Sequence, residues 1–403
     1  MAPFRARVLS IDSLADAEQE LCRIGADPGG TIRMAPKMLT RCVHLSDLQC
    51  RQANILKQEM LALGGDAAVA RGTVACSIDS TDVILIGTER QLHQLCRKLA
   101  PQPFGLPALA DELTRLLKYI TAEPQLWRTS KRDIPLNRPL IMGILNITPD
   151  SFSDGSCYLD TKLALDRAMQ MIEEGADIID IGGESTRPGS ATVDTEEEIQ
   201  RVLPIINELS GKIACPISVD TRKSQVAKAA IAAGAEIIND VSGLTFDPLL
   251  APVVAENKVG VVLMHTRGTP GNMQQNTCYD DLINEIYDGL RNLRDSAIIQ
   301  GISKEYIAID PGIGFAKTAA GNLEILRRLR EFTGLGQPLL IGSSRKSFIG
   351  TTLGRETADR LYGTAATVAS AVAHGASIIR VHDVRAMRDV ADMAHAITSP
   401  VSK

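Results

Sequence analysis

The sequence is poor in aromatic residues and carries no excess of positive charge. Phe, Trp and Tyr make up 3% of the 403 residues, and the formal net charge is -5. Proteins that hold nucleic acids need many basic side chains for the phosphates and, for single strands, aromatic rings on which bases stack. We therefore expect no nucleic-acid partner. A small anionic ligand is still compatible with this composition, because it needs only a local group of Arg and Lys side chains.

The sequence also lacks the patterns of secreted and membrane proteins. Its eight cysteines are scattered with no Cys-x-x-Cys pair, which argues against a disulfide framework and a structural zinc site. The opening segment MAPFRARVLSIDSLADAEQE has no apolar core of about 7–15 residues, and no apolar run approaches the ~20 residues of a membrane span. We expect a cytoplasmic protein with reduced thiols and no membrane contact.

From about residue 137 onward the sequence alternates short apolar runs with amphipathic stretches. This alternation is typical of βα units around a parallel sheet. The expected strands are LIMGILNI (140–147), DIIDIGG (177–183), PISVD (216–220), EIINDVS (236–242), VGVVLMH (259–265), YIAIDPG (306–312), PLLIGSS (338–344) and SIIRVHDV (377–384). Eight strands within about 265 residues is the number and size of a (β/α)8 or TIM barrel. We therefore predict an α/β fold with this barrel over residues 136–403.

A short internal repeat supports the barrel. Gly-Ala-x-Ile-Ile occurs at 175–179, 234–238 and 375–379, each time between a helical stretch and a strand. Glycine at this place fits the left-handed conformation that commonly ends a helix. These junctions are expected at the bottom of the barrel, where residues stabilise the fold rather than catalyse.

The first 135 residues have a different pattern. Segments 45–65, 89–100 and 106–120 are helix-like, whereas GTVACSID (72–79) and TDVILIGT (81–88) look like strands. We predict a smaller α+β domain that precedes the barrel and occupies residues 1–135, its last part being a linker. Its role stays open, because nothing in it points to a particular chemistry.

Polar side chains interrupt or follow every apolar run of the predicted barrel. In such barrels the active site forms at the carboxyl ends of the strands and in the loops after them. The polar residues there are Asn146, Glu184 to Arg187, Asp220, Asn239, Asp240, His265, Arg267, Asp310, Arg345, Lys346, Arg380, His382 and Asp383. A single residue of this kind would be a helix cap or part of a solvated loop. Contributions from all the strands instead predict a polar pocket.

The chemistry of this set falls into two groups. Donors suited to phosphate or another multivalent anion come from Arg187, Arg380, His382 and the turn IGSSRKS. A mixed array of acceptors and donors, suited to the edge of a polar heterocycle, comes from Asp220, Asn239, Asp310 and Lys346. We therefore predict a substrate with a heterocycle and an anionic group, the candidate being a diphosphate assisted by magnesium.

Eight segments with distinctive polar residues follow one another along the predicted barrel. They are GILNITPDSFSDG, DIGGESTRPG, SVDT, INDVSG, VLMHTRGTPGNMQ, DPGIGFAKT, GSSRKSFIG and RVHDV. In these segments and in their order the chain resembles the dihydropteroate synthase family, the pterin enzymes of folate biosynthesis. The match spans roughly residues 137–403. No single segment would suffice, since RVHDV is five common residues, but eight in order are specific.

The resemblance implies that 4-aminobenzoate displaces diphosphate from (7,8-dihydropterin-6-yl)methyl diphosphate to give 7,8-dihydropteroate. The residues expected to bind the pterin are Asp220, Asn239, Met264, Asp310 and Lys346. Those expected around the diphosphate are Asn146, Thr186, Arg187, Arg380 and His382, with Asn146 also ligating Mg²⁺. Those expected to form the 4-aminobenzoate site are Thr186, Pro188, Phe315 and Ser347.

The expected catalytic residues are Asp220, Asp310, Lys346 and Arg187. The carboxylates would stabilise positive charge that develops on the pterin, while cationic groups and Mg²⁺ would stabilise the leaving diphosphate. An arylamine is already neutral at pH 7, so no general base is assigned. The resemblance also implies small-molecule substrates, a homodimer formed through barrel helices, and competition by sulfonamides.

Two other functions are compatible with a pterin-binding barrel. A methyltetrahydrofolate:corrinoid methyltransferase shares the polar pterin slot, but it would not need the SRKSF and STRPG segments. A non-catalytic binding paralogue would be favoured by loss of Asn146, Arg187, Lys346 or Arg380, and all four are present. The extension of about 135 residues departs from most members of the family. It carries no signature of a pyrophosphokinase or an aldolase.

Overall fold

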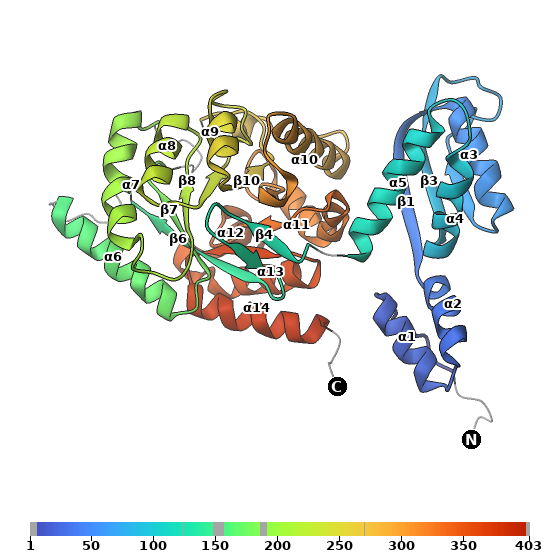
Figure 1. The fold of residues 1–403 in the computed structure, drawn as a ribbon, viewed down its shortest axis with the longest axis horizontal. Coiled ribbons are helices and arrows are strands. Elements are labelled where there is room, and N and C mark those ends of the chain that lie inside the picture. The colour runs from blue at the N-terminus through green and yellow to red at the C-terminus, as the bar shows by residue number, and fades with distance from the viewer. Residues whose placement is uncertain (1–5, 123, 148–156, 186–191, 270, 400–403) are drawn as a thin grey trace. The chain divides into compact units, whose positions relative to one another are not determined.

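The computed structural model describes residues 6–122, 124–147, 157–185, 192–269 and 271–399, and for residues 157–160 the backbone alone. Within these residues the chain forms two compact units, one that ends at Ala122 and one that extends to Ser399. The smaller unit contains a three-stranded sheet, and the larger unit contains an eight-stranded sheet and a two-stranded one (Figure 1). The buried hydrophobic residues of the two units form separate clusters.

The larger unit is the predicted barrel. Its eight strands pair in parallel in the order β11-β10-β9-β8-β7-β6-β13-β12, and a parallel bridge between Ile309 and Leu339 closes the ring. The strands are β6 (Leu140–Asn146), β7 (Ile178–Gly182), β8 (Ile217–Asp220), β9 (Ile237–Asp240), β10 (Gly260–Met264), β11 (Ile307–Asp310), β12 (Leu340–Ile341) and β13 (Ile378–Val381). Each strand lies within an apolar run identified in the sequence, so the (β/α)8 prediction is confirmed.

Helices connect the strands and surround the ring. They are α6 (Cys157–Glu173), α7 (Thr195–Leu209), α8 (Ser224–Ala233), α9 (Leu250–Asn257), α10 (Leu282–Ile299), α11 (Ala319–Arg327), α12 (Ser347–Leu353), α13 (Leu361–Ala373) and α14 (Val384–Thr398). Short 3-10 helices are η2 (Met273–Gln275), η3 (Lys304–Tyr306), η4 (Leu329–Leu335) and η5 (Thr357–Asp359). In the part of the chain that the structure describes, no helix has both the length and the apolarity to cross a bilayer.

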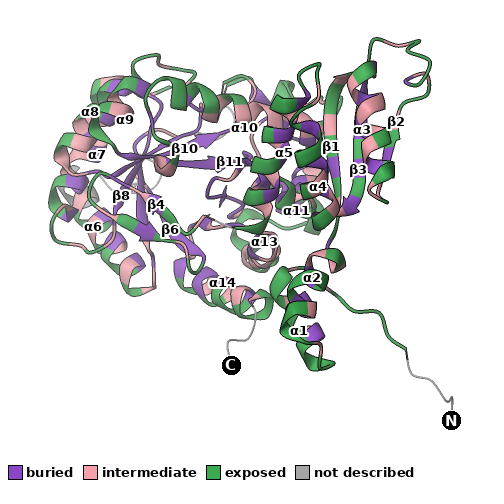
Figure 2. Cartoon of the chain, turned by 45° about the vertical axis from the view of Figure 1, so that its right-hand side comes forward, coloured by how far each residue is buried: buried purple, intermediate pink, exposed green. Residues whose placement is uncertain are grey.

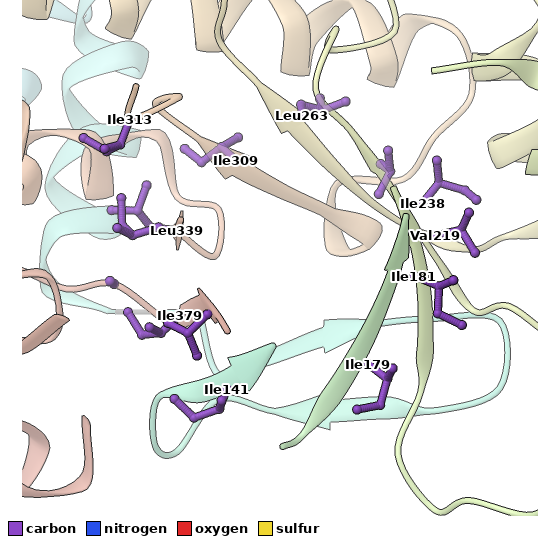
Figure 3. Packing of buried hydrophobic residues seen from close by; sticks show 14 of the residues in the cluster. Ile141, Ile179, Ile181, Val219, Ile238, Leu263, Ile309, Ile313, Leu339 and Ile379 are labelled. Carbon is purple, nitrogen blue, oxygen red and sulfur yellow. The ribbon is translucent and has the colours of Figure 1, made fainter. Parts of the chain in front are cut away.

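Alternate residues of each strand face opposite sides of the barrel wall. Ile179, Ile181 and Ile379 belong to the core between the strands and the helices (Figure 3). Ile178 and Ile378, one residue away, belong to a separate cluster inside the ring. Figure 2 shows the strands buried along most of their length. Full burial of an Ile side chain contributes about 1.5–3 kcal/mol, so the side to which each strand residue points is strongly fixed.

A hairpin covers the inner cluster at the amino-terminal ends of the strands. It pairs β4 (Leu126–Arg128) with β5 (Asp133–Pro135). Trp127 is fully buried in the cluster, and its Nε1 donates to the carbonyl oxygen of Tyr306 at 2.9 Å. The division between the units therefore lies at Ala122 rather than at residue 135, since the hairpin packs with the barrel. The polar composition of the hairpin hides this role, because its buried apolar contacts come from Trp127 and Ile134.

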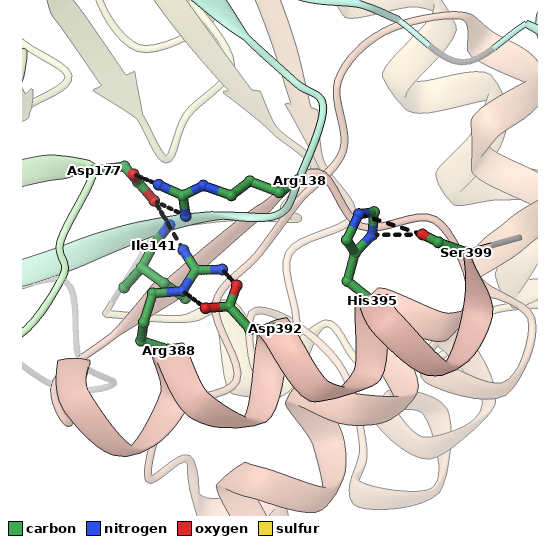
Figure 4. A network of polar contacts seen from close by, with 7 residues as sticks. All are labelled: Arg138, Ile141, Asp177, Arg388, Asp392, His395 and Ser399. Atoms are coloured by element: carbon green, nitrogen blue, oxygen red, sulfur yellow. Dashed lines mark hydrogen bonds and ion pairs between the residues drawn. The ribbon is translucent and has the colours of Figure 1, made fainter. Parts of the chain in front are cut away.

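Asp177, just before β7, ties the start of β6 to α14 (Figure 4). Its carboxylate accepts hydrogen bonds from Arg138 Nη2 at 2.5 Å, from Arg388 Nη1 at 3.0 Å and from the backbone N–H of Ile141 at 2.8 Å. Arg388 also pairs with Asp392 one turn further along α14. These contacts join elements at the end of the barrel opposite the carboxyl ends of the strands.

The Gly-Ala-x-Ile-Ile repeat forms the same helix ending three times. Gly175, Gly234 and Gly375 have φ angles of 98°, 124° and 93°. The alanine that follows each glycine donates its N–H back to the helix, and the pairs are Ala176 to Met171, Ala235 to Ala230 and Ala376 to Ala371. This is the Schellman pattern, so the prediction of left-handed glycines at these junctions is confirmed.

The smaller unit is α+β, as predicted. Its elements are α1 (Leu14–Arg23), α2 (Pro28–Met38), β1 (Thr40–Gln49), α3 (Cys50–Ala62), β2 (Asp66–Val69), β3 (Ser80–Thr88), α4 (Glu89–Leu99) and α5 (Leu106–Thr121). The antiparallel sheet has the order β1-β3-β2. Buried side chains of β3, α3, α4 and α5, such as Leu85, Leu56, Leu95 and Leu113, form its core.

Two details of the smaller unit differ from the prediction. The helix expected from residue 45 begins at Cys50, because residues 45–49 complete β1. Segment 72–79, expected to be a strand, forms turns in which Gly72 and Cys76 have φ angles of 99° and 49°. The N–H of Ser77 donates to the carbonyl oxygen of Gly72 at 3.1 Å. These two backbone groups therefore pair with each other within the turn instead of with a neighbouring strand.

Candidate active site

The inward-facing positions near the carboxyl ends of the strands carry polar side chains. They follow the apolar inner cluster in the same period of two, so Asp180 and Arg380 point to the same side as Ile178 and Ile378. This layer contains Asp180, Ser218, Asp220, Asn239, Met264, Asp310 and Arg380. The structure thus brings the predicted pterin residues of β8, β9, β10 and β11 to one end of the barrel.

Arg380 is held between two carboxylates. Its Nε donates to Asp180 Oδ2 at 2.6 Å, and its Nη2 donates to Asp220 Oδ2 at 2.7 Å. Asp180 is fully buried, and Asp220 is 6% exposed. Burial removes the hydration of a charged group, and only a close partner of opposite charge compensates for this loss. These two bonds use Nε and Nη2 of Arg380, and its expected role at the diphosphate stays a prediction.

Asp180 also fixes Asn239. Its Oδ2 accepts from Asn239 Nδ2 at 3.1 Å, and its Oδ1 accepts from Ser218 Oγ at 2.6 Å. A carboxylate only accepts hydrogen bonds, so the amide of Asn239 turns its NH2 group toward Asp180. The Oδ1 of Asn239 is therefore the atom left for a ligand. Asp180 is absent from the residues predicted above, which represent this strand only by Glu184 to Arg187 in the loop that follows it.

Asp220 offers a second acceptor. Its Oδ1 is buried and has no hydrogen-bond partner in the part of the chain that the structure describes. Burial raises the pKa of Asp220 to about 7, with Arg380 opposing the shift and the charge of Asp180 adding to it. An unpaired buried acceptor costs about 1–3 kcal/mol. A ligand that donates an N–H to this oxygen would recover that free energy.

Asp310 and Lys346 lie on the opposite part of the ring. Asp310 Oδ1 accepts the backbone N–H of Gly312 at 2.7 Å, and burial raises the pKa of this carboxyl while Lys346 opposes the rise. The ammonium of Lys346 donates to the carbonyl oxygen of Ile313 and lies 4.6 Å from the centre of the Phe315 ring. Burial lowers the pKa of Lys346 to about 8, while the charge of Asp310 opposes this shift. Lys346 is therefore a cation placed against the aromatic ring expected to contact 4-aminobenzoate.

A buried lysine behind Asp310 was not anticipated. Lys317 Nζ lies 2.9 Å from the carbonyl oxygen of Phe315, and 3.3 Å from both the carbonyl oxygen and Nδ1 of His265. Burial lowers the pKa of Lys317 to about 7 and that of His265 to about 3, so the imidazole is neutral and Nδ1 can accept. Lys317 thus joins the loops that follow β10 and β11. Its only signal in the sequence is its place in the segment DPGIGFAKT.

Several polar residues that follow the strands stabilise loops instead of facing a ligand. Asp240 accepts the backbone N–H groups of Ser242 at 2.7 Å and Leu244 at 2.6 Å. Arg345 donates two hydrogen bonds to Asp383, from Nε at 2.9 Å and from Nη2 at 2.5 Å. Within the IGSSRKS turn, predicted above to supply donors to an anion, the side chain of Arg345 is thus paired with Asp383. Polarity after a strand marks the end of the barrel but does not show where the side chain points.

The other predicted residues are placed as follows. Asn146 is half-buried at the end of β6, opposite Gly182 in the strand register, and Met264 is buried at the end of β10. The Oγ of Ser344 lies 2.9 Å from Nδ1 of His382. Ser347 is exposed at the first position of α12. The residues Thr186, Arg187 and Pro188 lie outside the described residues.

A cavity of about 300 Å³ lies among the loops that follow β8, β9, β10 and β11. Its walls are formed by Arg222, Val241, Ser242, Thr245, Phe246, Thr266, Gly268, Thr269, Met273 and Phe315. Arg222 stacks on the Phe246 ring at 4.1 Å and donates to Glu184 at 3.1 Å. This volume is at the lower end of the range for small-molecule sites. Of the residues predicted for substrate binding, Phe315 lines this cavity.

Comparisons with known proteins agree with this geometry. A family model described as pterin binding enzyme matches residues 142–382. The dihydropteroate synthase of Synechocystis sp. is 49% identical over 261 residues, which are 64% of this chain and 90% of that protein. The crystal structure of Xanthomonas albilineans dihydropteroate synthase with 4-aminobenzoic acid has a TM-score of 0.65 at 42% identity, covering 68% of this chain and 99% of that one.

One relative also aligns with the smaller unit. The probable bifunctional folylpolyglutamate synthase/dihydropteroate synthase of Haloferax volcanii is 39% identical over 383 residues, or 92% of this chain. The match covers 45% of that longer protein. The smaller unit is therefore shared with part of at least one relative.

Proposed function

The chain belongs to the dihydropteroate synthase family of pterin-binding enzymes, and we propose that it condenses (7,8-dihydropterin-6-yl)methyl diphosphate with 4-aminobenzoate. The products are 7,8-dihydropteroate and diphosphate, so the enzyme is a transferase of folate biosynthesis. The observation that carries the proposal is the buried oxygen Asp220 Oδ1, which has no hydrogen-bond partner among the described residues, next to Asn239, whose NH2 group is held by Asp180.

The acceptors fit the polar edge of a pterin. The pyrimidine part of a 7,8-dihydropterin presents an amino group and a ring N–H, both of which donate hydrogen bonds. Asp220 Oδ1 has no hydrogen-bond partner among the described residues, and Asn239 can offer its Oδ1 because its NH2 group donates to Asp180. Asp310 adds a carboxylate on the other side of the barrel. Met264, buried beside them, offers an apolar contact for the ring face.

In the reaction the bond between the methylene carbon and the diphosphate oxygen breaks, and the amine nitrogen bonds to the same carbon. The electron pair of the broken bond leaves with the diphosphate, and the proton of the amine is released afterwards. Positive charge that spreads into the pterin is stabilised by Asp220 and Asp310. Such fixed electrostatic stabilisation is often the largest contribution to catalysis. Lys346, beside Phe315, stabilises negative charge on the departing group.

Mg²⁺ is part of the proposal. Asn146 supplies a neutral oxygen at the end of β6, a donor type that Mg²⁺ accepts, and the substrate's phosphate oxygens supply the others. No group of three or more His, Cys, Asp or Glu side chains among the described residues could hold a metal without the substrate. When bound, the ion neutralises charge on the diphosphate. Arg187 and Thr186, outside the described residues, complete the proposed anion site with His382.

The proposed 4-aminobenzoate site combines Phe315 and Ser347 with Thr186 and Pro188, which lie outside the described residues. Support comes from the position of Ser347 directly after Lys346, whose ammonium contacts the Phe315 ring. A crystal structure of the Xanthomonas albilineans relative contains 4-aminobenzoic acid.

The chain is proposed to act as a cytoplasmic homodimer. Support for a dimer comes from an apolar groove of about 390 Å³ between α13 and α14, lined by Ala369, Ala373, Val390, Met393, Ala394 and Ile397 together with Asp389 and Thr398. Met393 and Ile397 are 65% and 76% exposed. Light scattering of wild type and Met393→Asp tests this, with loss of the dimer expected only in the variant.

The activity is tested by incubating the full chain with the pterin diphosphate, 4-aminobenzoate and Mg²⁺, and by following both products. Equal amounts of dihydropteroate and diphosphate are expected, and omission of 4-aminobenzoate removes the dihydropteroate. A wild-type protein that binds the pterin but forms no dihydropteroate would contradict the proposal and favour a non-catalytic paralogue.

A further inference from the structure

Asp180 lies below the residues proposed to touch the pterin and contacts three of the inward-facing polar side chains. It accepts from Ser218 with Oδ1, and from Asn239 and Arg380 with Oδ2. It is fully buried on β7, one layer further from the carboxyl ends of the strands than Gly182. Its hydrogen bonds therefore act on the ligand-facing groups of β9 and β13.

The first effect is on the amide of Asn239. With a carboxylate on one side, the amide has one favourable orientation, because an oxygen facing Asp180 would place two acceptors against each other. Without Asp180, the amide could rotate and present NH2 to the ligand. A pterin N–H would then meet a donor instead of an acceptor.

The second effect is on Arg380 and, through it, on Asp220. Asp180 holds Nε of the guanidinium, which directs Nη2 to Asp220 Oδ2 and leaves Asp220 Oδ1 for the ligand. The guanidinium is a planar fork, so fixing one nitrogen fixes the direction of the others.

We infer that Asp180 is a positioning residue that sets the hydrogen-bond polarity of the pterin site: its contacts orient Asn239 and Arg380, and its negative charge acts on the acceptor Asp220. The inference rests on the proposed function for the identity of the ligand. The geometry that supports it does not depend on the ligand, because every contact lies within the chain.

Two substitutions separate the charge of Asp180 from its hydrogen bonds. In Asp180→Asn the amide oxygen can still accept from Arg380 and Asn239, while its NH2 donates to Ser218 Oγ, so the geometry survives and the charge is lost. Asp180→Ala removes all three contacts. Ser218→Ala is the matched control, because it removes one hydrogen bond to Asp180 and leaves the bonds from Asn239 and Arg380 in place.

The charged groups that act on the pKa of Asp220 are Arg380 from β13, Asp180 from β7, Glu198 from α7 and Asp240 from β9, and Asp220 in turn acts on the pKa of Lys346 after β12. Of these, the negative charge of Asp180 raises the pKa of Asp220. Removing that charge therefore lowers the pKa, and Asp220 stays ionised to lower pH. A substitution that merely loosened the fold would not move this titration in a defined direction.

The probe is 6-hydroxymethyl-7,8-dihydropterin, whose dissociation constant is measured from pH 5 to 9. In Asp180→Asn the acid limb of binding is expected to move to lower pH. In Asp180→Ala the dissociation constant at pH 8 is expected to rise about 10- to 100-fold, the effect of a lost buried hydrogen bond, with Ser218→Ala changing it far less. The inference is overturned if Asp180→Ala and Ser218→Ala have the same dissociation constant for the pterin. It is also overturned if the acid limb of binding in Asp180→Asn lies at the same pH as in wild type.

A second measurement needs no ligand. Carbon-13 NMR of aspartate-labelled protein follows the carboxyl of Asp220, assigned with Asp220→Asn, in wild type and Asp180→Asn. A lower pKa in the variant supports the inference, and an equal or higher pKa overturns it, even if the wild type binds no pterin. Failure of the proposed function and failure of the inference are thus distinguishable, and the Asp180→Asn comparison remains available if Asp180→Ala does not fold.

Discussion

Replacing Arg380 by Met removes the cation that two buried carboxylates share. The side chain is 19% exposed, and its partners Asp180 and Asp220 are 0% and 7% exposed. Removing one partner of a buried ion pair costs about 3–5 kcal/mol, because the remaining charge is left without compensation. We therefore expect Arg380→Met to lower the free energy of unfolding by this amount at pH 8. This is a large share of the ~5–15 kcal/mol that stabilises a typical domain.

The loss should depend on pH in a defined direction. Arg380 holds the pKa of Asp220 down against the effect of burial, so its removal raises that pKa beyond about 7. A carboxyl whose pKa is higher in the folded than in the unfolded state destabilises the fold when it is ionised, and this penalty disappears as pH falls through the folded-state pKa. The destabilisation of Arg380→Met should therefore be smaller at pH 5.5 than at pH 8.

Urea unfolding followed by tryptophan fluorescence measures this effect in the full chain. The sequence contains one Trp, Trp127, which is fully buried in the inner cluster, so its fluorescence reports on the barrel unit. Arg345→Met is the control, because the pair of Arg345 and Asp383 is 38% and 21% exposed and should contribute only about 0.2–1 kcal/mol. The prediction is contradicted if Arg380→Met lowers the free energy of unfolding no more than Arg345→Met does, or if the effect of Arg380→Met grows toward low pH.

Four further outcomes are expected. Lys346→Met should lower turnover by about 100-fold or more, measured as diphosphate release, because it removes a cation from the reacting charges; near-normal turnover would show that Lys346 is misassigned. Lys317→Met should raise the pKa of Asp310 and move the acid limit of pterin binding to higher pH, opposite to Asp180→Asn, and an unmoved limit would contradict this role. Trp127→Ala should cost about 3–5 kcal/mol in calorimetric unfolding, and a cost below 1 kcal/mol would show that the hairpin does not close the barrel. EDTA should abolish dihydropteroate formation and added Mg²⁺ restore it, whereas full activity in EDTA would remove the ion from the mechanism.

The barrel could be predicted from the sequence because each strand is buried on both faces. Runs such as Gly260 to Met264 are therefore apolar throughout and separate clearly from the amphipathic helices. The boundary of the first unit could not be predicted in the same way. The hairpin around Trp127 is short, and most of its residues are polar, so its buried contact leaves little pattern in the sequence.

Candidate site residues could be predicted where a polar side chain ends a buried strand, as Asp220 and Asp310 do. The direction in which long side chains point could not. Arg345 follows β12 in the sequence, yet its guanidinium pairs with Asp383, and Arg380 binds two carboxylates. Asp180 was overlooked because a single carboxylate inside an apolar run can be assigned a partner only when the neighbouring strands are known.

The most direct test compares dihydropteroate formation by wild type and Asp220→Asn under saturating substrates and Mg²⁺. The substitution keeps the size of the side chain but removes the charged acceptor. We predict that wild type releases dihydropteroate and diphosphate in equal amounts, while Asp220→Asn is slower by about 100-fold or more. A wild type that forms no dihydropteroate, or an Asp220→Asn variant as active as wild type, would contradict this prediction.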